Sequence, residues 1–203
     1  MKSWGSTGIT VLIVLVISML VAITAASVIS TETTDTTTEE DYEQMLEDAA
    51  NEVSRYLLVK DQLGRFNEDQ QIEKIVLWLT PLVEQDIDIS QLTIELNNGE
   101  SVMMLTYSGS NPRESNDIFE QSIWDDIDGT NFGLIPVIDL DDSLVNNNAF
   151  DDASDNAYLV FKLPTGMMMN KYDEMVVKLV PSSGIARTLY LKAPMPMKSI
   201  VEL

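Results

Sequence analysis

The chain has 203 residues, and its 33 acidic residues outnumber its 12 basic ones, which gives a formal net charge of −21. A chain so acidic has too few cations to neutralise phosphates, which excludes nucleic-acid binding as its main role. It contains no cysteine and no histidine, which excludes disulfides, thiolate metal sites, cysteine nucleophiles and Ser-His-Asp catalysis. Carboxylates, hydroxyls and a few lysines or arginines remain for any chemistry.

The N-terminal part carries no charge between Lys2 and Glu32, and residues 9–29 are nearly all apolar or small. As a helix this run would measure about 32 Å, enough to cross the hydrocarbon core of a bilayer. It could be a secretory signal peptide cut near residues 25–27, a permanent membrane anchor, or a helix retained after a short leader is cut off. The run is longer than the core of a secretory signal, which weakens the first interpretation.

The leader interpretation depends on the residues that precede the run. The lead MKSWG ends at Gly5, and residues 6–15 read STGITVLIVL. This stretch resembles the mature start of archaellins, the archaeal flagellins, whose precursors carry a class III, type IV pilin-like signal that is cut after a glycine. The family usually has a basic residue before that glycine, where this chain has Trp4. Bacterial-type pilins have a glutamate at the fifth mature position, which is Thr10 here. The resemblance implies cleavage between Gly5 and Ser6.

Later stretches extend the resemblance in the family's order. Residues 87–94 read IDISQLTI, residues 190–196 read YLKAPMP, and the chain ends with IVEL at 200–203. The resemblance implies a structural subunit of the archaellum, an extracellular filament for swimming, in which the apolar helices form a core bundle. The residues it assigns to that bundle are Gly8, Ile9, Val11, Leu12, Ile13, Val14, Leu15, Val16, Leu20, Val21 and Ala25.

The same resemblance implies the partners. They are further copies of the chain, related archaellins, the archaellum motor with its membrane platform, and a prepilin-like signal peptidase, with the membrane holding the precursor. An archaellum accessory protein or an adhesive type IV-like pilin would carry the same kind of signal. A membrane-anchored extracellular hydrolase that uses paired carboxylates is a further alternative, but acidic clusters without a nucleophile motif are common on surfaces. No enzymatic activity and no required cofactor are expected.

Residues 30–38 read STETTDTTT, and β-branched threonine is a modest helix former. Residues 39–58 are rich in helix formers and carry one apolar stripe at helical spacing. The stripe consists of Tyr42, Leu46, Ala49, Val53 and Leu57. We therefore predict a helix over residues 6–57 that is weakened at 30–38. Its stripe would pack on the chain's own outer domain or on neighbouring subunits.

The remainder, residues 58–203, reads as a β domain. Strands are predicted at residues 55–63, 73–83, 92–96, 102–107, 133–140, 157–163, 174–181 and 186–193. Asn97-Asn98-Gly99 is a hairpin signal between two of them. Short strands without intervening helices predict an antiparallel sandwich, and archaellin outer domains are immunoglobulin-like. The predicted fold class is therefore α+β: a leader at 1–5, a long N-terminal hydrophobic helix at 6–57, and an immunoglobulin-like antiparallel β-sandwich at 58–203.

One acidic turn is a candidate cation site. Asp126, Asp128 and Asn131 flank Gly129 in part of an EF-hand-like loop and could place oxygens on Ca²⁺ or Mg²⁺. The closing glutamate of that loop is missing, and the alternative is a solvated acidic turn. The resemblance adds that some archaellins bind a metal in this domain. The other acidic loops are expected to be solvated surface: Asp139, Asp141, Asp142, Asp151, Asp152 and Asp155.

Overall fold

A computed structural model describes Met45 and residues 56–82, 86–182, 185–196 and 198–203. The chain divides into two units, Met1–Gln44 and Met45–Leu203, and every strand named below belongs to the second. The leader 1–5, the apolar run and nearly all of the predicted helix 6–57 lie outside the described residues. Within the described part of the chain, no helix has the length and apolar character needed to cross a membrane.

Strands form close to all eight predicted segments. They are β1 (Leu57–Phe66), β2 (Ile72–Pro81), β4 (Thr93–Asn97), β5 (Val102–Ser110), β6 (Asn131–Ile138), β8 (Asn156–Lys162), β9 (Glu174–Val180) and β10 (Arg187–Lys192). The sequence pattern does not predict three shorter strands, β3 (Ile87–Asp88), β7 (Ala149–Phe150) and β11 (Ile200–Glu202). It also misses four single-turn helices, η1 (Ile89–Gln91), η2 (Ile118–Glu120), α3 (Ile123–Asp126) and α4 (Ser143–Asn146).

Burial along the strands explains why they form. In β9, Met175, Val177 and Leu179 are buried while the residues between them are half-buried, the alternation of a strand with one face on a core. In β2, the consecutive Ile75, Val76 and Leu77 are all buried. Both faces of β2 are therefore covered, which requires a second layer of side chains on its outer side.

Nine strands form one continuous sheet in the order β10-β9-β4-β5-β6-β8-β2-β1-β11. Every neighbouring pair is antiparallel except β5 and β6, which are parallel. A parallel pair needs a crossover connection, and residues 111–130, with η2 and α3, supply it. The predicted hairpin at Asn97-Asn98-Gly99 is present: Asn97 pairs with Val102, and Gly99 adopts a φ of +87°, which glycine tolerates best.

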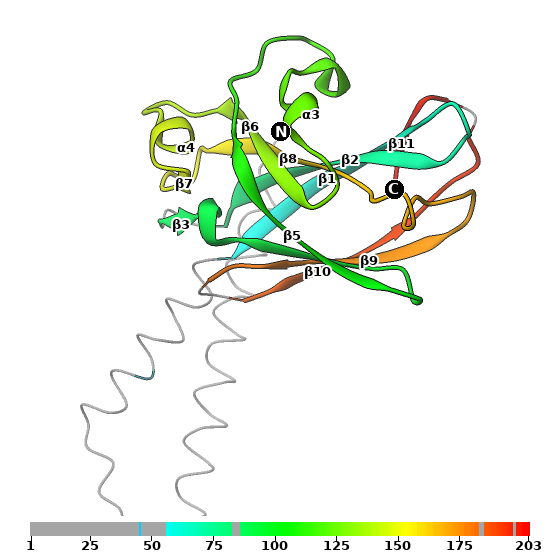
Figure 1. The fold of residues 1–203 in the computed structure, drawn as a ribbon. Coiled ribbons are helices and arrows are strands. Elements are labelled where there is room, and N and C mark those ends of the chain that lie inside the picture. Colours follow the sequence, from blue (N-terminus) through cyan, green and yellow to red (C-terminus); the bar gives the residue numbers. More distant parts are fainter. Residues whose placement is uncertain (1–44, 46–55, 83–85, 183–184, 197) are drawn as a thin grey trace, which may run out of the picture. The chain divides into compact units, whose positions relative to one another are not determined.

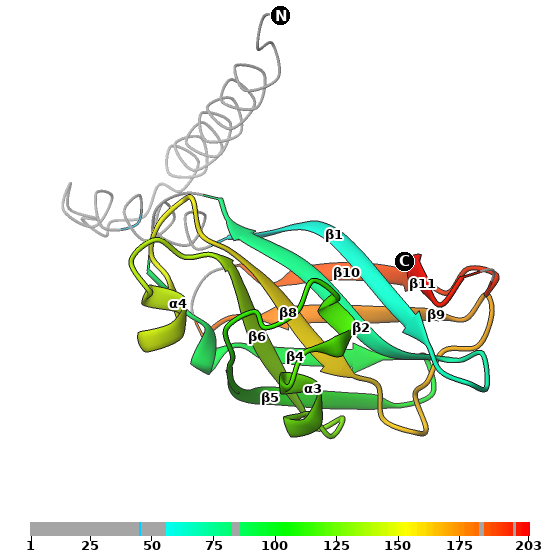
Figure 2. The same cartoon turned by 90° about the horizontal axis from the view of Figure 1, so that it is seen from above.

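The sheet curls at β5, because different parts of this strand pair with different neighbours. Residues 102–106 pair with β4, and residues 106–110 pair with β6. The register shifts between Tyr107 and Gly109, and Gly109 has a φ of +151°. Bulges of this kind bend a strand and let it pass from one layer to another. Figures 1 and 2 show the result: β10, β9 and β4 form one layer, and β6, β8, β2 and β1 form the other.

One core fills the space between the two halves of the curled sheet. Leu57 of β1, Ile94 of β4 and Leu191 of β10 belong to the same buried cluster, although they come from strands far apart in the sheet order. The domain is therefore β-rich with facing layers. Its hydrogen bonding is continuous around the curl and includes a parallel pair, so the predicted all-antiparallel two-sheet sandwich is not confirmed.

A second, smaller core lies under the crossover. Phe119, Ile123 and Trp124 pack on Val76 and Val160, which point outward from the curled sheet. The rings of Phe119 and Trp124 stack with centroids 5.9 Å apart. The crossover thus covers the outer faces of β2 and β8, which explains their burial on both sides.

Candidate functional site

The predicted assembly residues lie outside the described part of the chain. This holds for the cleavage pair Gly5 and Ser6 and for the bundle residues between Gly8 and Ala25. Their roles therefore stay predictions. The candidate sites that the structure describes are all on the β domain.

The predicted cation turn lies between α3 and β6 and is held by its own hydrogen bonds. The Asp128 carboxylate accepts from the backbone N–H of Thr130 at 3.0 Å and from its hydroxyl at 2.7 Å, and these bonds lower the pKa of Asp128. The Asn131 amide accepts from the Asp128 N–H at 3.1 Å and donates to the carbonyl of Asp126 at 3.4 Å. These bonds account for the turn without a metal, and cation binding at Asp126, Asp128 and Asn131 stays a prediction.

A different acidic cluster forms at the end of the domain that carries α4 and β7. Asp139 and Asp141 come from the loop after β6, and Asp155 comes from the turn before β8. One carboxylate oxygen from each lies within 4.8 Å of the others. Both Asp139 oxygens and one Asp155 oxygen are buried without a hydrogen-bond partner among the described residues. Hard divalent cations take such oxygen ligands, so these three residues could hold Ca²⁺ or Mg²⁺.

Asp155 differs most from the expectation of a solvated acidic loop, because its side chain is fully buried. Its Oδ2 accepts from the backbone N–H groups of Asp151 at 3.2 Å and Asp152 at 3.1 Å. Burial raises the pKa of Asp155, and the charges of Asp139 and Asp151 raise it further against those hydrogen bonds. A bound cation would relieve both effects, since it replaces lost water and offsets the repulsion.

The sequence holds only a faint signal for this cluster. Asp139 and Asp141 have the alternate spacing of a cation loop, but Asp155 lies 14 residues later on the far side of α4 and β7. Pairing of β6 with β8 brings the two loops together, with Ile138 opposite Asn156. That pairing depends on the tertiary structure. In the sequence, the exposed Asp142 and Asp152 beside the cluster cannot be distinguished from its three members.

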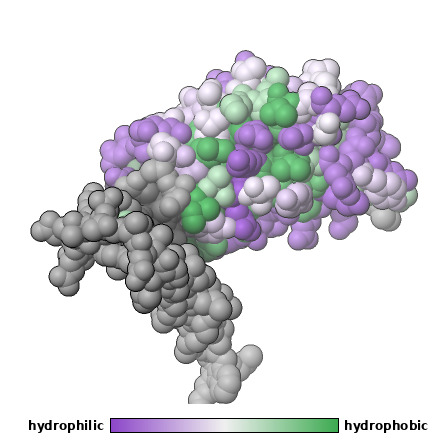
Figure 3. Space-filling model, turned by 90° about the horizontal axis from the view of Figure 1, so that it is seen from below, coloured by the Kyte–Doolittle hydropathy of each residue, from purple (hydrophilic) through white to green (hydrophobic). Residues whose placement is uncertain are grey.

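The outer face of β5, β4, β9 and β10 is a second candidate surface. Val102, Asn97, Val176 and Tyr190 lie in register across these four strands. Tyr190 is 77% exposed and Val102 is 60% exposed. Figure 3 views the molecule from the side of these strands and shows apolar surface among hydrophilic residues. Tyrosine is enriched in surfaces that contact other proteins, which makes this face a candidate for subunit contact.

Comparison with known proteins gives the family. The model of the family described as archaeal-type flagellin matches residues 5–191. The chain belongs to the archaeal-type flagellin family. It is a structural subunit of the archaeal flagellum, or archaellum, a motility filament outside the cell, and the family is structural rather than catalytic.

Two curated flagellins are distant relatives of this archaellin. It is 25% identical to flagellin B5 of Pyrococcus abyssi over 66% of this chain and 66% of that protein. It is 27% identical to flagellin B3 of Methanocaldococcus jannaschii over 73% of this chain and 72% of that protein.

Two solved structures share the fold. Archaeal flagellin FlaB1 from Methanocaldococcus jannaschii aligns with a TM-score of 0.66 at 20% identity, covering 72% of this chain and 94% of that one. A chain from the archaeal flagellum of Methanospirillum hungatei aligns with a TM-score of 0.53 at 10% identity over the full length of both chains. The curled β domain is thus an archaellin fold.

Proposed function

We propose that this archaellin is made as a membrane-held precursor, is cut between Gly5 and Ser6, and joins the filament through its apolar N-terminal helix. The observation that carries the proposal is the extent of the family match, which begins at residue 5 and runs through the apolar segment into the β domain. The uncharged run at 9–29 is long enough to lie in the membrane first and in a filament core afterwards.

Packing would supply the free energy for this transfer. Lipid tails and a bundle of apolar helices are similarly apolar, so the hydrophobic effect favours neither strongly. Small residues let helix backbones approach closely, and Gly8, Ala22 and Ala25 supply them within the run. The helix 6–57, with its weak stretch at 30–38, would connect this core to the β domain. The domain, with its two facing layers, would face outward.

The subunit contacts in this proposal are heterologous, because an open helical filament needs two different surfaces on each copy. Further copies of the chain are the main partners, together with related archaellins where they are present. The archaellum motor and its membrane platform would hold the filament base, and a prepilin-like signal peptidase would act on the precursor. Carboxylates would shape the surface and take no part in catalysis.

Mass spectrometry of the N-terminal peptide from sheared filaments tests the proposal directly. We expect the mature chain to begin at Ser6. A chain that begins at Met1, or one that begins after residue 27, would contradict it. Gly5→Leu should block cleavage and leave full-length protein in the membrane, while Ser3→Leu, a matched change inside the leader, should still be processed. Normal filaments built from Gly5→Leu subunits would remove the cleavage assignment.

Cation binding is a second candidate role, and a specific observation favours it. In the cluster of Asp139, Asp141 and Asp155, both Asp139 oxygens and one Asp155 oxygen are buried without a hydrogen-bond partner among the described residues. Such a site would stabilise the end of the domain where β6 and β8 begin to diverge. We expect it to act on the stability of the domain.

A further inference from the structure

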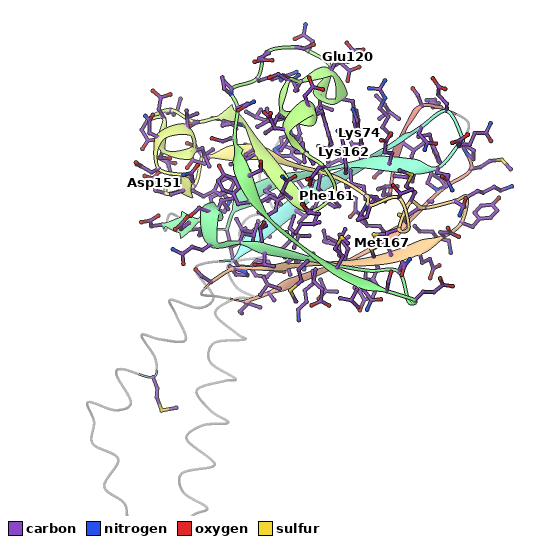
Figure 4. The ribbon with its side chains drawn as sticks, viewed as in Figure 1. Lys74, Glu120, Asp151, Phe161, Lys162 and Met167 are labelled. Atoms are coloured by element: carbon purple, nitrogen blue, oxygen red, sulfur yellow. The ribbon has the colours of Figure 1, made fainter. Side chains whose placement is uncertain are left out.

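Three cations lie side by side on the outer face of the curled sheet. Arg65 of β1 is directly opposite Lys74 of β2, and Lys74 is directly opposite Lys162 of β8. Residues opposite each other on neighbouring strands share a face, and like charges in this arrangement repel. We call these three residues the cationic row, and Figure 4 shows its two lysines next to each other.

Among the described residues, no acidic side chain forms a close ion pair with the row. The chain has nearly three acidic residues for each basic one, so pairing would be easy to arrange. Within the described residues, however, the only ion pair within 4.0 Å joins Lys192 to Glu174, far along the sheet order from the row. Burial and the charges of Lys162 and Arg65 lower the pKa of Lys74, and the charges of Glu73 and Asp125 oppose this only in part.

Packing explains two members of the row but not the third. The Lys74 ammonium lies 4.8 Å from the Trp124 ring centroid. The Arg65 guanidinium lies 5.9 Å from the Phe119 ring centroid and donates to the Phe119 carbonyl at 3.3 Å. These contacts cover the second core. The Lys162 side chain forms no ion pair within 4.0 Å in the part of the chain that the structure describes. Its charge contributes to the lowered pKa of Asp128, and it completes the repulsive row.

A surface of opposite charge lies at another end of the same domain. Residues 139–155 contain six aspartates and no basic residue. Asp141, Asp142 and Asp152 are exposed there, and Leu140 between them is 82% exposed, so the loop projects into solvent. In Figure 4, Asp151 marks this acidic end at the left of the domain, away from Lys74 and Lys162 near its middle. The two surfaces are thus separate on one subunit and complementary between subunits.

We propose that the cationic row of one archaellin binds the acidic end, residues 139–155, of a neighbouring copy in the filament. The contact joins two different surfaces, so each copy can offer one and receive the other, which propagates an open assembly. It also relieves the repulsion within the row and within the acidic end at the same time. This inference rests on the proposed function, because it assumes that copies of the chain assemble.

Charge reversal tests the contact in cells whose only archaellin is this chain. The row variant is Lys74→Glu with Lys162→Glu, and Lys162→Glu alone is a milder form that leaves the Trp124 contact intact. The matched control is Lys171→Glu with Lys198→Glu, which changes the net charge equally at exposed lysines outside the row. The rescue variant adds Leu140→Lys and Asp152→Lys to the row variant, and it leaves the Asp139–Asp141–Asp155 cluster unchanged.

We expect the row variant to lower the number of filaments seen by electron microscopy by about tenfold or more. Lys162→Glu alone should lower that number less, and the control variant should leave it unchanged. The rescue variant should restore filaments. Row variants that assemble as well as the control would overturn the inference. Filaments lost in Lys162→Glu and not restored by the rescue would also overturn it, since another partner would then occupy the row. Absence of filaments from the unmodified chain would instead overturn the proposed function.

Discussion

Gly133 of β6 lies against the side chain of Ile123 in α3, so closely that a Cβ at position 133 would clash with the Ile123 Cδ1. This contact sets how tightly the crossover packs on the outer face of the sheet. A glycine in a strand interior usually weakens the strand, and here it admits the close approach of another element.

Gly133→Ala should therefore destabilise the domain by about 1–3 kcal/mol, because the added methyl group overpacks the contact with Ile123. Denaturant unfolding of the detergent-solubilised chain measures the change. Gly166→Ala is the matched control, since no atom lies within 4 Å of a Cβ at that position, and it should change stability little. The double variant Gly133→Ala with Ile123→Val should recover part of the loss. Equal stability of the two alanine variants would show that the contact is looser than described.

Asp155 should make stability depend on pH in the unusual direction for a carboxylate. Burial raises the pKa of Asp155 above its ordinary value of 3.8. Between that value and its higher folded pKa, the folded chain binds more protons than the unfolded chain, so this residue's contribution to stability falls as pH rises. Asp155→Asn keeps an acceptor for the Asp151 and Asp152 N–H groups and removes the charge.

The measurement is the difference in free energy of unfolding between Asp155→Asn and the unmodified chain, in the presence of a chelator, from about pH 4 to about pH 7. The asparagine variant should gain stability relative to the unmodified chain as pH rises. Asp128→Asn is the opposite control, because hydrogen bonds lower the pKa of Asp128 and its contribution is lost as pH falls. A pH-independent difference for Asp155→Asn would mean that Asp155 titrates normally.

Divalent cations should stabilise the domain beyond the effect of ionic strength. A ligand that binds only the folded chain adds about 2.7 kcal/mol when its free concentration is a hundredfold above its dissociation constant. Thermal melts in Ca²⁺, Mg²⁺ and Na⁺ at matched ionic strength separate binding from screening of the acidic surface. Asp139→Asn with Asp155→Asn should abolish the increment.

Asp126→Ala with Asp128→Ala decides between the two candidate cation sites. If the increment disappears in this variant and survives in Asp139→Asn with Asp155→Asn, the predicted turn binds the cation and the buried cluster does not. Equal melting temperatures for the unmodified chain in all three salts would exclude both sites.

A charge in the middle of the apolar run should prevent assembly. Val16→Lys or Leu20→Lys places a charge where insertion into a membrane costs about 2.5–3.5 kcal/mol, and a packed bundle of apolar helices is no better a solvent for it. Filament yield and the amount of chain retained at the cell membrane are the measurements. Thr36→Lys, which adds the same charge outside the run, should still assemble. Full-length filaments from Val16→Lys would exclude the run from the filament core.

Much of the β domain can be predicted from local sequence. Alternation such as that of Met175, Val177 and Leu179 marks a strand by itself, because a half-buried strand repeats every two residues. Asn97-Asn98-Gly99 likewise predicts its hairpin, because the turn needs a positive φ that glycine supplies. The short strands β3, β7 and β11 cannot be recognised this way, because two or three residues are too few to show a period.

The burial of individual acidic residues cannot be predicted from the local sequence. Asp128 lies in a turn that the sequence singles out, and its carboxylate is occupied by Thr130 within the same turn. Asp155 lies in a stretch that resembles ordinary solvated surface, and it is buried beside Asp139. Burial of a carboxylate depends on which loops surround it, and those loops come from distant parts of the chain.

The sequence by itself determined the class of protein: the uncharged run at 9–29, the glycine before it and the strand-rich remainder point to an archaellin, and the family match agrees. These features are readable because each depends on neighbours within one helix or one strand. Only the tertiary structure decided that the sheet curls as one piece through Gly109, that Arg65, Lys74 and Lys162 lie side by side, and that Asp139 meets Asp155. Each of these follows from strand register between distant segments, and register is set by the packing of the whole core.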